Sequence, residues 1–282
     1  MIAQSINNNL PIGIFDSGVG GLTVYRALHA ELSGERFVYL GDTARVPYGT
    51  KSRETIEKYS IENARFLAAH GIKLLVVACN TASALALPAL RLSINIPVIG
   101  VIEPGAREAI AMSRGKKIAV IATEATIRSG AYRTAVWKLM PDAAVIERAC
   151  PLFVSLAEEG WAGTEVARLV AREYLGGLNT EHSAPDTLVL GCTHYPILRH
   201  EVQEVMGDKV FLIDSGEATA RYVVEVLSSL NLARPRTENP PQNRRLCDDL
   251  DHFYVTDAAE RFARVAERFL GTIPSSLEAI EL

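Results

Sequence analysis

Short apolar segments alternate with helical segments along almost the whole chain. Helical spacing of apolar residues is found, for example, over residues 52–70, 164–175 and 197–206. Consecutive apolar positions, rather than alternating ones, mark the strand-like runs at residues 11–15, 37–40, 74–77, 98–102, 118–122, 143–146, 188–190 and 211–213. Continuous apolar strands separated by helices are typical of parallel sheets covered by helices on both faces. The sequence therefore predicts an α/β fold.

The C-terminal part of the chain departs from this alternation. Residues 234–251 are rich in proline, asparagine and charge, which predicts a loop. Residues 258–270 predict an amphipathic helix, because Phe262, Val265, Ala266 and Phe269 share one side of it.

The bulk properties exclude several classes of partner. The formal net charge is −4, so the chain lacks the basic field that holds a phosphate backbone, and nucleic acid is excluded as the main partner. No apolar run approaches the roughly 18–20 residues of a membrane span. Residues 1–13 lack the basic and apolar regions of a signal peptide. We therefore expect a cytoplasmic protein that does not bind membranes.

Two of the four cysteines have similar local sequences. Cys79 follows the apolar run LLVVA and Cys192 follows LVLG, and a polar pair comes after each cysteine. The carboxyl ends of parallel strands are where open α/β sheets bind ligands. Asn80 or Thr81 could cap a helix after Cys79, and a thiol at a helix N-terminus favours the thiolate. The alternative is that each cysteine is a small buried hydrophobic residue.

The remaining cysteines and several polar residues have less specific surroundings. Cys150 and Cys247 lie in no such pattern, and we expect all four thiols to be free in a cytosolic chain. Asp214 precedes Ser and Gly and predicts a helix cap. Glu158 and Glu159 precede a glycine and, taken alone, are typical of a solvated helix end.

Two further strand ends carry residues suited to ligand binding. Asp16 and Ser17 precede the glycine-rich segment GVGG, whose amides could bind a carboxylate. The alternative is a plain strand–helix turn in which Asp16 is a cap. The loop GDTARVPYG, with Tyr48 and Gly49, would line the same edge of the sheet, or would form an ordinary surface turn.

Nucleotide, metal and serine-hydrolase chemistry find no support in the motifs. The third glycine position of GxGxxG is occupied by Thr23, and the chain contains no GxxxxGK[ST], HExxH or GxSxG motif. Cys192 and His194 alone supply too few ligands for a closed zinc site. We therefore predict that no metal is bound.

Four motifs in one order closely resemble those of the glutamate racemases, a family of the aspartate/glutamate racemase superfamily. They are FDSGVGGLTV, GDTARVPYG, ACNTASA and LGCTHYPIL, and the resemblance runs from about Ile12 to Leu270. One small departure is Ala78, where many members have threonine. The resemblance implies interconversion of L- and D-glutamate without pyridoxal phosphate or any other cofactor. It implies that Cys79 takes the proton from D-glutamate and Cys192 takes it from L-glutamate.

The resemblance also implies roles for residues around the two cysteines. Asp16 would assist Cys79, while His194 and Glu158 would assist Cys192, although Glu159 adjoins Glu158 and competes for that role. The substrate-binding residues that it implies are Asp16, Ser17, Tyr48, Gly49, Asn80, Thr81, Thr193 and His194.

The family fold implies two similar α/β domains with mainly parallel sheets flanked by helices. A pseudo-twofold would relate them, with the active site in the cleft between them. We expect one domain to comprise residues 1–103 plus 215–282 and to carry Cys79, and the other to comprise residues 104–214 and to carry Cys192. The implied biological role is D-glutamate supply for bacterial peptidoglycan and hence for cell shape, and the oligomeric state, including a homodimer, stays open.

Three other functions compete with this interpretation. An aspartate or hydantoin racemase would share the fold, although His194 and the complete DSG and PYG motifs favour glutamate. A cysteine hydrolase would use Cys192 as nucleophile and His194 as base, but it would leave Cys79 without a role. A two-lobed binding module would need neither cysteine.

Overall fold

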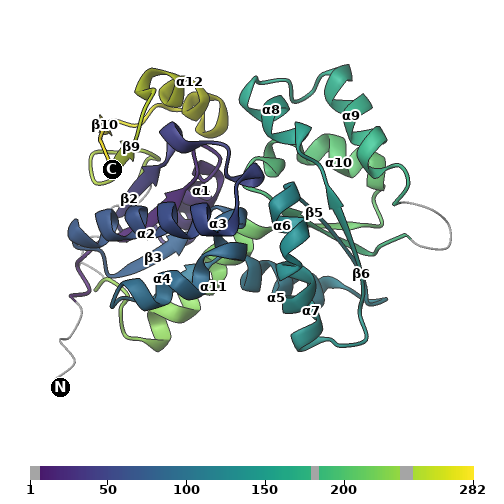
Figure 1. Cartoon of the computed structure of the whole chain (residues 1–282), viewed down its shortest axis with the longest axis horizontal. Coiled ribbons are helices and arrows are strands. Elements are labelled where there is room, and N and C mark those ends of the chain that lie inside the picture. Colours follow the sequence, from purple (N-terminus) through teal and green to yellow (C-terminus); the bar gives the residue numbers. More distant parts are fainter. Residues whose placement is uncertain (1–6, 179–183, 236–243) are drawn as a thin grey trace.

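A computed structural model describes residues 7–178, 184–235 and 244–282 of the chain. Its strands form two separate sheets, and every neighbouring pair of strands is parallel (Figure 1). The six-stranded sheet has the order β10-β9-β2-β1-β3-β4 and the four-stranded sheet has the order β6-β5-β7-β8. The predicted α/β class, with parallel sheets flanked by helices, is confirmed.

The strands of the two sheets come from different parts of the chain. The six-stranded sheet contains β1 (Ile12–Asp16), β2 (Phe37–Gly41), β3 (Leu74–Val77), β4 (Val98–Gly100), β9 (His252–Val255) and β10 (Leu277–Ala279). The four-stranded sheet contains β5 (Lys117–Ala122), β6 (Ala144–Ala149), β7 (Thr187–Gly191) and β8 (Phe211–Asp214). We call the sheet within 12–100 and 252–279, with its covering helices, the first lobe. The sheet within 117–214, with its helices, is the second lobe.

Both faces of each sheet are buried, which explains the continuous apolar strands. In β1, Ile14 belongs to one apolar cluster and Phe15 to another on the opposite face. In β5, Val120 and Ile121 likewise point into two different clusters. Successive side chains of a strand point to opposite faces, so a sheet covered on both sides needs an apolar residue at every position.

Helices connect the strands and cover the sheets. Those packed with the first lobe's strands are α1 (Leu22–Glu31), α2 (Arg53–Ala69), α3 (Asn80–Leu85), α4 (Leu87–Ser93), α11 (Ser215–Ser229) and α12 (Ala259–Leu270). The second lobe has α5 (Ile102–Met112), α6 (Glu124–Ser129), α7 (Ala131–Leu139), α8 (Leu152–Glu158), α9 (Glu165–Leu175) and α10 (Arg199–Met206). Short 3₁₀ helices in the described part of the chain are η1 (Thr43–Arg45), η2 (Tyr48–Thr50) and η3 (Tyr195–Leu198).

The chain crosses between the lobes twice, through α5 and through α11. Ala106 of α5 packs in a cluster with strands of the four-stranded sheet, and Val223 of α11 packs with the six-stranded sheet. The predicted boundaries at 103/104 and 214/215 fall next to these helices, and the division into two domains stays a prediction.

Most predicted elements are present, and the differences have local causes. Helix α2 begins after Ser52, whose hydroxyl accepts a hydrogen bond from the amide of Thr55, and it ends before Gly71, which has a φ of 71°. Residues 197–206 are not one helix, because η3 occupies their start. The run at 98–102 is a strand only to Gly100, since Ile102 begins α5.

The C-terminal region contains two strands that the sequence did not predict. β9 pairs with β2, and β10 pairs with β9. Part of the predicted loop, residues 236–243, lies outside the described residues, and the predicted helix at 258–270 is α12. Asp214 caps α11 as expected, because its Oδ1 accepts from the amides of Gly216 and Glu217.

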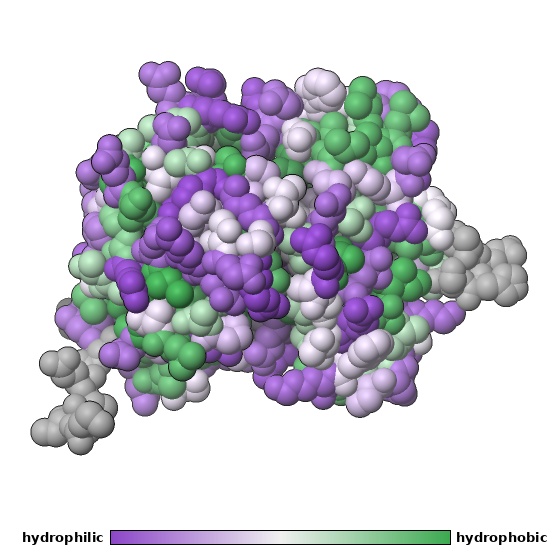
Figure 2. Space-filling view, in the orientation of Figure 1, coloured by the Kyte–Doolittle hydropathy of each residue, from purple (hydrophilic) through white to green (hydrophobic). Residues whose placement is uncertain are grey.

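The surface is mixed in character, with one apolar region over the second lobe. Figure 2 shows hydrophobic residues gathered on the upper right, where Figure 1 places α8 and α9. Trp161, between α8 and α9, and Val166 and Leu169 of α9 are about half exposed. None of the helices within the described ranges combines the length and the apolar composition that crossing a membrane requires.

Candidate active site

Asp16 ends β1 and turns the chain into the glycine-rich segment before α1. The side chain is fully buried, and its Oδ2 accepts a hydrogen bond of 2.9 Å from the amide of Gly18. Burial raises the pKa of Asp16, and the nearby charge of His194 partly offsets this effect. Its other oxygen, Oδ1, has no hydrogen-bond partner within the described residues. Asp16 is therefore both a turn residue and a buried carboxyl group with one free acceptor.

Cys79 lies just after β3 and is the N-cap residue of α3. Its Sγ accepts from the amide of Ala82 at 3.5 Å and lies 3.5 Å from the hydroxyl oxygen of Ser17. The sequence suggested that Asn80 or Thr81 would cap this helix. Both residues are instead inside the helix, and Cys79 occupies the N-cap position.

Burial sets the protonation of Cys79. Burial, with a contribution from the charge of Asp16, raises the pKa of Cys79 to about 12. The helix N-terminus acts in the expected direction, but burial outweighs it and the thiolate is not the favoured form of this residue. The amide of Ala82 does lower its pKa, but by less than burial raises it. Cys79 is a thiol at neutral pH.

Cys192 follows β7 and lies at one end of a chain of polar side chains. Its Sγ is 3.8 Å from Nδ1 of His194, and Nε2 of His194 is 3.0 Å from Oε1 of Glu158. Arg261 donates to the other carboxylate oxygen of Glu158 at 3.0 Å. Glu159 is exposed at the end of α8, so Glu158 is the glutamate that lies against His194.

His194 is held as a cation between the Cys192 sulfur and the Glu158 carboxylate. Burial acts against its protonation, but the hydrogen bonds to Cys192 and Glu158 outweigh this effect and raise the pKa of His194 to about 10. Burial also opposes ionisation of Glu158, yet the contact with His194 leaves the pKa of Glu158 below its usual value. An imidazolium beside a sulfur favours negative charge on that sulfur.

The glycine-rich turn of the first lobe packs directly on the Cys192 loop. The Thr23 hydroxyl donates to the carbonyl of Thr193 at 2.8 Å. A Cβ atom on Gly20 would lie only 2.3 Å from Oγ1 of Thr193 and 2.4 Å from the His194 ring. The charge of Cys192 also contributes to the raised pKa of Cys79, after the larger effects of burial and Asp16. The two cysteines therefore belong to one buried region.

Asn80 and Thr81 make contacts that cross from the first lobe to the second. The Tyr132 hydroxyl donates to Oδ1 of Asn80 at 2.6 Å, and among the described residues Nδ2 of Asn80 has no acceptor. The Thr81 hydroxyl oxygen is 3.0 Å from that of Thr123 and 3.2 Å from that of Thr126. A buried amide donor without an acceptor suits an anionic ligand.

Tyr48 is buried, and its hydroxyl proton is already engaged in a hydrogen bond within the protein. The hydroxyl donates to Asp42 and accepts from Nδ2 of Asn63 at 3.1 Å. Arg45 also donates to Asp42, so this carboxylate holds the loop together. The Tyr48 hydroxyl therefore has no proton left for a substrate carboxylate, and this segment would have to offer main-chain groups to a ligand.

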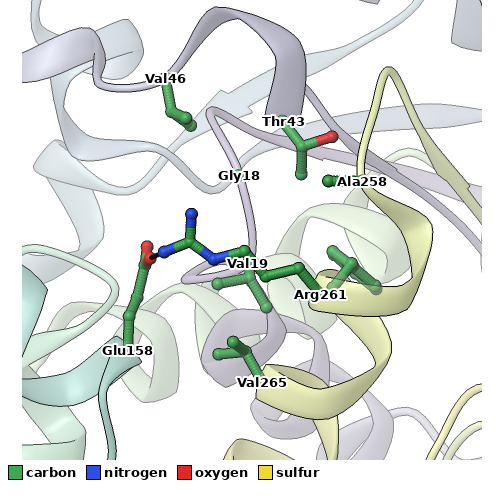
Figure 3. Close-up of a pocket in the computed structure, with 9 residues that line it drawn as sticks. Gly18, Val19, Thr43, Val46, Glu158, Ala258, Arg261 and Val265 are labelled. Atoms are coloured by element: carbon green, nitrogen blue, oxygen red, sulfur yellow. Dashed lines mark hydrogen bonds and ion pairs between the residues drawn. The ribbon is translucent and has the colours of Figure 1, made fainter.

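A small pocket opens beside this site (Figure 3). Gly18 and Val19 from the glycine-rich turn, Glu158 from α8, and Arg261, Phe262 and Val265 from α12 line it. The helical pattern of α12 was evident from the sequence, but its position next to Glu158 was not. Among the described residues, no three acidic, histidine or cysteine side chains gather closely enough to hold a metal ion.

Comparison with known proteins gives one consistent result. Residues 12–223 match the family model described as Asp/Glu/Hydantoin racemase. The chain is 55% identical over 260 residues to a glutamate racemase of Geobacter metallireducens, with 92% of each chain covered. It is 46% identical to one of Syntrophus aciditrophicus, covering 96% of this chain and 97% of that one.

Solved structures agree. The crystal structure of glutamate racemase isoform RacE1 from Bacillus anthracis has a TM-score of 0.90 at 37% identity, covering 98% of this chain and 99% of that one. The Francisella tularensis glutamate racemase in complex with D-glutamate has a TM-score of 0.85 at 38% identity, covering 97% and 98%. An aspartate racemase of Picrophilus torridus, at 18% identity, a TM-score of 0.57, and 80% and 99% coverage, shares the fold alone.

Proposed function

The chain belongs to the Asp/Glu/Hydantoin racemase family, and we propose that it is an amino-acid racemase that interconverts L- and D-glutamate through Cys79 and Cys192. The observation that supports this mechanism best is the unequal surroundings of two buried thiols in one region. Cys79 is kept as a thiol by burial, while the Cys192 sulfur lies 3.8 Å from Nδ1 of His194, whose raised pKa of about 10 keeps the ring protonated. Such unequal surroundings suit a pair in which one sulfur acts as the acid while the other acts as the base.

The reaction needs a base on one face of the substrate and an acid on the other. The Cys192 thiolate takes the Cα proton of L-glutamate and becomes a thiol, which leaves a carbanion at Cα. The Cys79 thiol then gives its proton to the opposite face, which produces D-glutamate and a Cys79 thiolate. That second state is the one that accepts D-glutamate. A well-placed acid or base of this kind typically contributes about 10²–10⁴-fold to the rate.

The surrounding polar groups would bind the substrate and stabilise the carbanion. Nδ2 of Asn80 and the hydroxyls of Ser17, Thr81 and Thr193 are donors that suit the carboxylates. The amides at Tyr48 and Gly49 are further donors of this kind. Donors aimed at developing charge in a site without water are more effective than the same donors in water.

The acidic groups would assist each thiol differently. Asp16 adds negative charge near Cys79, which favours its thiol form, and Oδ1 of Asp16 is an acceptor for the substrate ammonium group. His194, backed by Glu158, would hold the charge of the Cys192 thiolate and keep its orientation. No cofactor takes part in these steps.

A cysteine hydrolase is the second candidate, because Cys192, His194 and Glu158 have the order of a nucleophile, a base and an orienting acid. Replacing Cys79 distinguishes the two. Cys79→Ser should abolish racemisation but spare hydrolysis by a Cys192 nucleophile. An aspartate racemase is less well supported, because the relative of that name shares only 18% identity.

The direct experiment is incubation of the purified protein with L-glutamate in D₂O, without added cofactor. We expect D-glutamate that carries deuterium at Cα, formed at least about 10²-fold more slowly by Cys79→Ser and Cys192→Ser. Cys150→Ser, at a buried cysteine outside this cluster of motifs, is the matched control and should retain activity. Unchanged substrate with no isotope uptake would exclude glutamate racemisation.

The proposal extends to the cellular role that the family resemblance implies, which is supply of D-glutamate for peptidoglycan in the bacterial cytoplasm. A strain that depends on this chain should require external D-glutamate when the gene is removed. The wild-type gene should restore growth, and the Cys79→Ser gene should not. Whether the protein is a homodimer is a separate question that sedimentation would answer.

A further inference from the structure

Helix α12 of the first lobe lies beside α8 of the second lobe at the same rim of the molecule (Figure 1). Ala157 of α8 packs in the same apolar cluster as Phe262, Val265 and Phe269 of α12. The Phe269 ring also meets the His194 ring edge-on, with 5.9 Å between the ring centroids. Two helices that are far apart in the sequence therefore form one packed contact next to the Cys192 loop.

Two arginines of α12 bind the last residue of α8. Arg268 donates to the main-chain carbonyl of Glu158 at 2.6 Å, which supplies a partner for a carbonyl at a helix C-terminus. Arg261 reaches across the pocket and donates to Oε2 of Glu158 at 3.0 Å, as Figure 3 shows. These contacts restrain Glu158, whose Oε1 lies 3.0 Å from Nε2 of His194.

We propose that Arg261 is a positioning residue for the proton transfers of Cys192. It acts through Glu158 and His194, and it touches neither sulfur. This inference rests on the proposed function, and it adds a residue from the opposite lobe to the machinery of one cysteine.

The geometry separates the two cysteines with respect to Arg261. The charged groups that face His194 are Cys192, Glu158 and Asp16, and those that face Glu158 are His194 and Arg261. Cys79 is instead influenced first by burial, then by Asp16, Ser17 and the amide of Ala82, and least by the charge of Cys192. Loss of Arg261 should therefore disturb the Cys192 steps and leave the Cys79 steps intact.

The series of contacts from Arg261 through Glu158 and His194 to Cys192, which we call the relay, also depends on the relative position of the two lobes. Arg261 comes from the first lobe, whereas Glu158, His194 and Cys192 belong to the second. The ion pair exists only when α12 lies against α8. Arg261 would thus couple the contact between the two lobes to the orientation of His194 beside Cys192.

The two enantiomers have equal energy, so kcat/KM must be equal in both directions in every variant. Directional information therefore comes from isotope effects. Slower proton transfer at Cys192 should increase the primary deuterium isotope effect with L-glutamate labelled at Cα. It should decrease the effect with labelled D-glutamate, because the Cys79 step then limits the rate less. A purely structural disturbance would not move the two effects in opposite directions.

The test uses Arg261→Met, which removes the charge and keeps most of the chain length. We expect kcat to fall about 3- to 10-fold, a fraction of what a direct acid or base contributes, and KM to change less than about 2-fold. Arg261→Lys should recover more than half of kcat. Arg264→Met, at an exposed arginine on the same helix, is the matched control and should behave as wild type.

A substrate-free measurement separates this inference from the proposed function. Alkylation of Cys192 by iodoacetamide, followed by peptide mass spectrometry, should be at least about 3-fold slower in Arg261→Met than in wild type, because thiolate reacts and thiol does not. If wild type fails to racemise glutamate but this difference is present, the relay stands and the proposed function fails. Equal alkylation rates in Arg261→Met and Arg264→Met, or isotope effects that shift together, would overturn the inference.

Discussion

At Gly20, one added methyl group should push the glycine-rich turn of the first lobe away from Thr193 and His194 of the second lobe. A Cβ atom there would lie 2.3 Å from Oγ1 of Thr193 and 2.4 and 2.5 Å from two ring atoms of His194. The φ of Gly20 is not positive, so alanine fits the backbone and the effect comes from contact alone. We therefore expect Gly20→Ala to disturb the contact between the lobes rather than the turn itself.

The size of the effect follows from the contact distances. Real Cβ contacts begin at 3.0–3.4 Å, so a neighbour 2.3 Å away must move by 0.7–1.1 Å. Thr193 can rotate its hydroxyl away, but His194 is held by Glu158 on one side and packs against Phe269 on another. A misplacement of about 1 Å at a reacting centre can cost about 10²-fold in rate, and we expect a loss of that order in kcat/KM.

The assay compares Gly20→Ala with Gly34→Ala, a position where an added Cβ meets nothing within 4 Å. Racemisation is followed by circular dichroism with both enantiomers, and folding is followed by urea denaturation. We expect full activity from Gly34→Ala. Overpacking in Gly20→Ala should lower the free energy of unfolding by about 1–3 kcal/mol. Activity of Gly20→Ala within threefold of wild type would refute the reasoning.

Three further predictions concern individual contacts of the site. Activity should fall as pH rises through about 10, where His194 loses its proton. Glu158→Gln should move this loss of activity to lower pH, because the Glu158 carboxylate raises the pKa of His194. A pH–rate profile from 6 to 11 that is the same in wild type and Glu158→Gln would contradict this. Tyr132→Phe should raise KM by about 5- to 10-fold, since it leaves a buried oxygen of Asn80 without its donor at a cost of about 1–3 kcal/mol, and an unchanged KM in steady-state kinetics would argue against that role. At pH 8, iodoacetamide should modify Cys192 before the other three cysteines, whose pKa values burial raises to about 12, and peptide mass spectrometry would show the order.

The sequence predicted the central strands well, because burial on both faces leaves a clear apolar run. It did not predict β9 or β10. β10 has only three residues, and its last two are exposed, so its strand character comes from pairing with β9 rather than from its composition. Likewise, the helix expected at 197–206 begins as the 3₁₀ helix η3, with Pro196 in its first turn.

The motifs also led to the main parts of the site, but not to the contacts across it. Cys192, His194 and Glu158 come together as the resemblance implied, and the structure distinguishes Glu158 from Glu159. The contact of Arg261 with Glu158 joins residues 103 positions apart, and no local pattern encodes such a pairing. The hydrogen bond from the Tyr48 hydroxyl to Asp42 could not be predicted from the sequence either, because it depends on how this loop folds back on itself.

The six-stranded sheet combines strands from the beginning and the end of the chain, and this has a consequence for synthesis on the ribosome. β2 ends at residue 41, and its neighbour β9 begins only at residue 252. The nascent chain must therefore carry β2 as a bare strand edge while the whole second lobe is translated, and such an edge favours intermolecular pairing. A circular permutant that places residues 252–279 ahead of β1 would supply β9 first. Its first sheet could close as soon as β4 leaves the exit tunnel, with a lower yield of aggregates at high expression.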